Sequence, residues 1–61
     1  MFEDLVGTKV KIVFQDGSNV IVFFGKINAV NEGFVVLETE SNVKYLSWKN
    51  IIKMEEVLNY E

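Results

Sequence analysis

The fold is decided by residues 9–25, which read KVKIVFQDGSNVIVFFG. In the first half of this stretch apolar side chains alternate with lysines, and a period of two is typical of a β-strand with one buried face. Asp16-Gly17 then separates two apolar runs, which is a strong hairpin signal because glycine accepts a positive φ. The stretch therefore predicts two antiparallel strands, with a tight turn at residues 15–18.

The second of these strands is expected to bend strongly. From Asn19 to Asn28 the strand carries apolar side chains on both faces, and Gly25 interrupts it, which indicates a bend or a bulge. Three further short strands are expected, at residues 34–38, 43–47 and 51–54. Five short strands around a bent second strand predict an all-β, five-stranded SH3-like barrel. An OB barrel is the alternative, but it usually carries a helix where this chain has only residues 39–42.

The segments outside the strands are less clearly patterned. Residues 1–6 favour a short helical turn, and residues 48–50 a tight turn or one turn of 3₁₀ helix. The acidic tail, residues 55–61, can extend the last strand or begin a helix. It can equally dock a partner or pack across a barrel opening, and the sequence leaves these alternatives open.

Length and composition predict a single domain over residues 1–61 that assembles with copies of itself. A chain of this size buries only about 60% of its unfolded surface, so disulfides, metals or oligomerisation usually supplement the core. The sequence has no cysteine and no histidine, which excludes thiolate and imidazole metal sites, and no cofactor is expected. Because hydrophobic residues make up 49% of the chain, the surplus indicates a subunit interface and a homo-oligomer.

The charge balance and the N-terminus limit the choice of partner and compartment. The net charge is −3, whereas nucleic-acid binders usually carry a basic excess. All six basic residues are lysines, which lack the bidentate fork of arginine. The acidic start is unlike a signal peptide, and the longest apolar run, residues 20–24, is far short of the ~20 residues of a spanning helix. We therefore expect a cytoplasmic protein without a membrane partner.

Three blocks of the chain resemble the Sm-like family, which includes the bacterial Hfq branch. They are LVGTKVKI at 5–12 with FQDG at 14–17, GKINAVNEGFVVL at 25–37 and YLSWKNIIKM at 45–54. The resemblance covers about residues 5–54. It implies a ring of six or seven subunits, in which the fourth strand of one subunit pairs with the fifth strand of the next. It also implies binding of short single-stranded RNA.

In the Sm-like arrangement the turns containing Asn31 and Trp48 lie near one another, which suggests an RNA site. The Trp48 ring would stack on a base, Asn31 and Asn50 would read base edges, and Lys49 would meet a phosphate. Trp48-Lys49-Asn50 occupies the place of the family's Arg-Gly turn and of the Lys-His pair of the Hfq branch, which are both absent here, and Asn31 falls where the family usually has Asp. The alternative interpretation makes Phe34 a core residue, Trp48 a subunit anchor and the asparagines turn formers.

Two other groups of charged residues have a functional and a structural interpretation. Lys9, Lys11 and Lys26 are expected on one outer face, either as a weak basic patch for phosphates or as protection of an edge strand against aggregation. Glu38 and Glu40 can form a carboxylate pair, but their spacing is more typical of a solvated strand edge. We therefore expect a protein that is not an enzyme.

Two functions follow from these patterns. The first is an Sm-like oligomeric RNA-binding module that contacts single-stranded RNA through Asn31, Trp48, Lys49 and Asn50. The second is a non-catalytic protein-interaction or assembly module that keeps the barrel without an RNA site. The resemblance favours the first function, and the negative charge favours the second.

Overall fold

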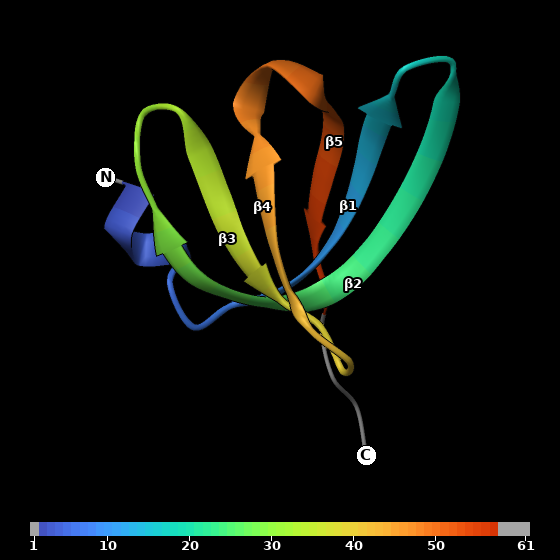
Figure 1. Ribbon diagram of the computed structural model, residues 1–61. Helices are drawn as coiled ribbons and strands as arrows, with labels where there is room; N and C mark the ends of the chain where they lie inside the picture. The colour runs from blue at the N-terminus through green and yellow to red at the C-terminus, as the bar shows by residue number, and fades with distance from the viewer. Residues whose placement is uncertain (1, 58–61) are drawn as a thin grey trace.

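The hairpin predicted from residues 9–25 is the centre of one five-stranded antiparallel sheet. The computed structural model describes residues 2–57, and its strand order is β4-β3-β2-β1-β5 (Figure 1). The strands are β1 (Lys9–Asp16), β2 (Asn19–Val30), β3 (Phe34–Glu38), β4 (Val43–Ser47) and β5 (Ile51–Glu56). Two short 3₁₀ helices are η1 (Phe2–Leu5), before β1, and η2 (Trp48–Asn50), between β4 and β5. The predicted small, bent, barrel-like all-β fold is confirmed.

Several strands extend beyond their predicted ends. Asp16 pairs with Asn19, so that only two residues form the hairpin turn, and Gly17 takes a φ of +63° there. Strand β2 continues to Val30 and β5 continues to Glu56, which extends the strand into the acidic tail. The alternation of apolar side chains ends before the strands do, because the backbone hydrogen bonds between paired strands do not depend on side-chain polarity. Residues 58–61 lie outside the described part of the chain.

Strand β2 is bent at the glycine that the sequence singled out. Its first part pairs with β1 as far as Lys26, and from Lys26 onward it pairs with β3 (Figure 1). A Cβ atom on Gly25 would clash with the backbone carbonyl of Glu38, so the end of β3 can lie this close only to glycine. A register shift between Ile27 and Ala29 follows the bend. The bend folds the two halves of the sheet over one core.

The core is small and lies on the concave inner face of the sheet. Its fully buried side chains are Val10, Ile12, Ile27, Val35, Leu37 and Leu46. Partly buried side chains surround them, from Leu5, Phe14, Phe23, Val30, Trp48, Ile51 and Met54. Every element of the described chain therefore contributes to one apolar cluster.

Substitution of Gly25 tests the close approach that bends β2. We expect Gly25→Ala to lower the free energy of unfolding by at least about 2 kcal/mol, because the added methyl group must displace the Glu38 backbone. Urea unfolding followed by circular dichroism, at one protein concentration, measures the change.

Gly33→Ala is the matched control. A Cβ atom at Gly33 would meet only Asn31 Oδ1, at 3.6 Å, and this glycine has no positive φ. We expect its effect to stay within about 0.5 kcal/mol. Equal losses of unfolding free energy in the two variants would show that a general effect of replacing glycine by alanine, rather than the Glu38 contact, explains the result at Gly25.

Candidate functional site

The two turns predicted to form an RNA site are joined by hydrogen bonds. The Trp48 indole Nε1 donates to the backbone carbonyl of Asn31 at 2.7 Å. The Trp48 backbone N–H donates to the carbonyl of Gly33 at 3.2 Å. The turn between β2 and β3 is thus fixed against η2, although the residues are 17 positions apart in sequence.

Asn31 uses its side-chain oxygen to build its own turn. Its Oδ1 accepts hydrogen bonds from the backbone N–H groups of Gly33, at 2.8 Å, and Phe34, at 2.9 Å. Asparagine commonly stabilises turns in this way. The side-chain amide N–H₂ remains the group of Asn31 that would read a base edge, and that role stays a prediction.

The three predicted residues of η2 differ in their surroundings. The Trp48 ring is half-buried and packs against the hydrophobic core of the chain. Lys49 and Asn50 are exposed. The structure therefore brings Asn31, Trp48, Lys49 and Asn50 to one end of the sheet, where Trp48 holds the turn and Lys49 and Asn50 face outward.

The interpretation of Phe34 as a core residue is wrong. The alternation of β3 directs Val35 and Leu37 inward, which places Phe34 on the outer face. There its ring meets Tyr45 of β4 edge to face, with the ring centroids 5.7 Å apart. Tyr45 is 68% exposed, and Val43 lies exposed two residues earlier on the same strand. An apolar outer strip on β3 and β4 is the feature that the sequence analysis missed.

The edge strands of the sheet are β4 and β5, and within the described chain each pairs with a neighbouring strand on one side only. Natural proteins usually protect such edges with outward charges or proline, but this sequence has no proline. The lysine of β4, Lys44, lies over the Phe23 ring, 5.4 Å from its centroid, and Leu46 beside it is buried in the core. On β5, Ile52 is 57% exposed. Both edges therefore carry exposed apolar side chains.

The predicted lysine patch lies on the outer face, but not at an edge. Lys9 and Lys26 are direct cross-strand partners, and Lys11 lies two residues from Lys9 on the same face. Because β1 and β2 are interior strands, the interpretation as edge protection is wrong. Lys11 and Lys53 both approach the carboxylate of Glu55, at 3.9 and 3.2 Å.

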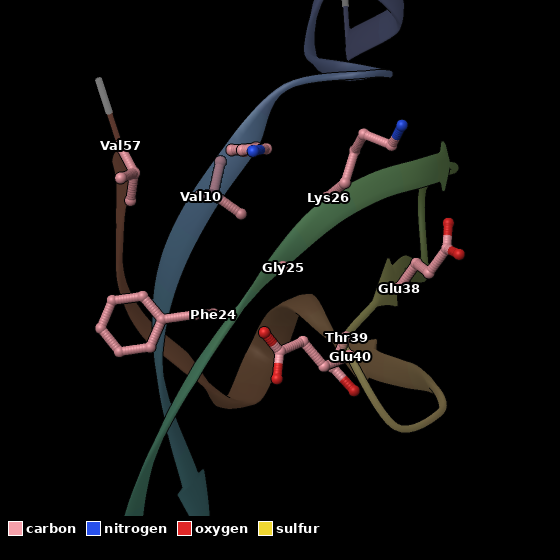
Figure 2. A pocket seen from close by; sticks show the side chains of 9 residues that line it. Val10, Phe24, Gly25, Lys26, Glu38, Thr39, Glu40 and Val57 are labelled. Carbon is pink, nitrogen blue, oxygen red and sulfur yellow. The ribbon is translucent and has the colours of Figure 1, made fainter. Parts of the chain in front are cut away.

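An open groove adjoins this patch at the bend of β2 (Figure 2). Its volume of about 390 Å³ lies in the usual range of small-ligand sites, about 300–1,000 Å³. Glu38 and Glu40 both border the groove, one at the end of β3 and the other in the following turn. The full lining is Lys9, Val10, Phe24, Gly25, Lys26, Glu38, Thr39, Glu40 and Val57.

Comparison with known proteins finds no match to a protein-family model, to a curated protein or to a solved structure. Within residues 2–57, no three acidic side chains gather closely enough to hold a metal ion. The short helices in this part of the chain are too small to cross a membrane. The candidate sites therefore rest on their own geometry.

The indole hydrogen bond predicts a structural role for Trp48. We expect Trp48→Phe to lower the free energy of unfolding by about 0.5–1.5 kcal/mol from the lost hydrogen bond, with a further loss from the smaller ring. Thermal unfolding followed by circular dichroism measures it. Lys49→Gln, one residue away on η2, is the control and should change stability by less than about 0.5 kcal/mol. Equal stability of Trp48→Phe and the unchanged protein would contradict this role.

Proposed function

We propose that this chain is a non-catalytic assembly module whose copies join through the free edges of β4 and β5. The observation that carries the proposal is that the sheet ends in two edge strands that each have a free side and exposed apolar side chains, although β5 also carries the charged side chains of Lys53, Glu55 and Glu56. An unpaired edge offers a row of backbone N–H and C=O groups to another chain. Pairing of β4 from one copy with β5 of the next leaves the opposite edges free, so assembly continues until a ring closes.

The small core supports the same proposal. Only six side chains of the described residues are buried, and the chain has no cysteine to form disulfides. Edge pairing would cover Tyr45 and Val43 on one side of the junction and Ile52 on the other. Burial of such side chains contributes about 25 cal/mol per Å² of apolar surface. The interface would therefore supply stability that a chain of this size lacks alone.

RNA binding at η2 is the second candidate function. The observation that favours it is that Lys49 and Asn50 are exposed on η2. The hydrogen bond from Trp48 to Asn31 holds η2 beside the turn that contains Asn31. In a ring this end of each subunit would repeat around the assembly, so weak contacts would add along one RNA strand. The net charge of −3 weakens the case, because phosphate contacts dominate RNA affinity.

A lysine placed on an edge strand tests the assembly. We expect Ile52→Lys to convert the oligomer to folded monomers, because the charge must otherwise be buried in the β4–β5 junction. Native mass spectrometry gives the number of chains, and circular dichroism shows that the sheet persists.

Val20→Lys is the matched control, since Val20 is also 57% exposed but lies beside the hairpin turn at the start of β2, on neither of the strands β4 and β5. Its oligomeric state should not change. A monomeric unmutated protein at micromolar concentration would refute the assembly. Dissociation by both variants would place the interface on the outer sheet face instead of the edges.

For the second candidate, a short uridine-rich RNA is added to the same samples. We expect Lys49→Gln to weaken RNA binding and to reduce its salt dependence, because one phosphate contact is lost. The oligomer should remain intact. RNA binding that is indifferent to Lys49→Gln would exclude η2 as the binding surface.

A further inference from the structure

Lys26 lies between two cross-strand partners, Lys9 on β1 and Glu38 on β3, and its pairing with Lys9 does not stabilise the sheet. Like charges placed directly opposite one another destabilise a sheet, and these two residues face each other on the interior strands β1 and β2. Neither lysine forms an ion pair in the described chain, whereas Lys11 and Lys53 share the carboxylate of Glu55. Two cations that repel each other on one face form a preorganised site for an anion.

An exposed aromatic ring stands beside this pair. Phe24 lies two residues before Lys26 on β2 and directly opposite Lys11 on β1, and it is 60% exposed. Figure 2 shows Phe24 and Lys26 on either side of Gly25 along the groove. A phenyl ring set among lysines on an open sheet can stack on a nucleobase while a lysine meets the phosphate.

The opposite wall of the groove comes from the end of β3 and the turn that follows it. Glu38, Thr39 and Glu40 line it and offer hydrogen-bond acceptors. Carboxylates accept hydrogen bonds from the exocyclic amino group of a base, but they repel a phosphate. Across the sheet the order is Glu38 on β3, Lys26 on β2 and Lys9 on β1, so this carboxylate adjoins Lys26, and the space between the two lysines lies on the other side of Lys26 from it. This arrangement favours a ligand with an anionic end and an amino-bearing aromatic end.

We propose that this groove binds a nucleotide unit, with its phosphate between Lys9 and Lys26 and its base on the Phe24 ring. The unit is either a free mononucleotide or one residue of a single strand, since both present the same chemistry. The site lies on the outer face of β1 and β2, away from η2, and it does not depend on assembly through β4 and β5. An acidic peptide would satisfy the lysines but would meet repulsion from Glu38 and Glu40.

Fluorescence anisotropy with a labelled oligoadenylate of about ten nucleotides tests the site, at low and at moderate salt. We expect Phe24→Leu to weaken binding by about fivefold or more, because base stacking is lost while an apolar side chain remains. Lys9→Gln and Lys26→Gln should each weaken binding and reduce the slope of log K against log salt concentration by about 0.7.

Lys53→Gln on β5 is the control, because it removes the same charge outside both the groove and η2, and it should bind like the unchanged protein. Equal losses in Lys53→Gln and Lys9→Gln, or no loss in Phe24→Leu, would overturn the site in favour of diffuse charge attraction. Absence of binding at low salt would also overturn it. Native mass spectrometry of each sample records the oligomeric state, so that a failure of assembly and a failure of this site are seen separately.

Competition experiments distinguish the source of the nucleotide. Displacement of the labelled strand by adenosine monophosphate supports a free-nucleotide site, and displacement only by unlabelled oligoadenylate supports a strand-binding site. Equal displacement by a polyglutamate peptide would overturn the proposal and indicate an acidic protein partner.

The thermal stability of Lys9→Gln gives a readout independent of ligand. Removal of the repulsion with Lys26 should raise the melting temperature by about 1–3 °C. A lower melting temperature would show that Lys9 stabilises the sheet, and would remove the argument that the pair is kept for binding.

Discussion

The close approach of the Glu38 carbonyl to Gly25 is the constraint on which the rest of this structure depends. Strand β2 pairs with β1 before this point and with β3 after it, so the bend decides how the two halves of the sheet face each other. The fully buried side chains come from β1, β2, β3 and β4, and they meet only because the sheet is folded over at this glycine. The bend also brings the end of β3 beside the outer face of β2, where it forms one wall of the groove.

The strands were predictable because their signals are local. Alternation in residues 9–14, the Asp16-Gly17 turn and the isolated Gly25 each point to one structure without knowledge of the rest of the chain. Strand ends were less predictable, since β2 and β5 continue through residues whose polarity carries no periodic signal. Pairing order is a property of the whole chain. For that reason the sequence alone did not reveal that Lys9 and Lys26 face each other on interior strands.

Only part of the candidate RNA site could be predicted from the sequence. Aromatic and amide side chains in two turns were correctly expected to lie together, and the hydrogen bond from Trp48 to Asn31 joins them. The hydrogen bonds that these side chains make within the protein were not predictable, because their partners are backbone groups: the N–H groups of Gly33 and Phe34 donate to Asn31 Oδ1, and Trp48 Nε1 donates to the Asn31 carbonyl. The outward position of Phe34 was missed because a fully apolar run hides which alternate residues face the core. A signal was present in β4, where Val43 and Tyr45 alternate with the inward Lys44 and Leu46.

Net charge is a poor guide to local chemistry in a sheet this small. Each lysine has a distinct environment: Lys11 and Lys53 share Glu55, Lys44 lies over Phe23, Lys49 is exposed on η2, and Lys9 and Lys26 face each other. The lysines that neutralise carboxylates or contact a ring already have their interactions in the free protein. Lys9 and Lys26 form no ion pair within the described chain, although Glu38 is the cross-strand partner of Lys26, so an anion bound between the two lysines would gain a new interaction despite an overall charge of −3. Screening limits the reach of charges to about 8–10 Å at ordinary salt, so Glu38 and Glu40, which line the groove, affect an anion bound at the lysine pair far more than the carboxylates elsewhere on the chain.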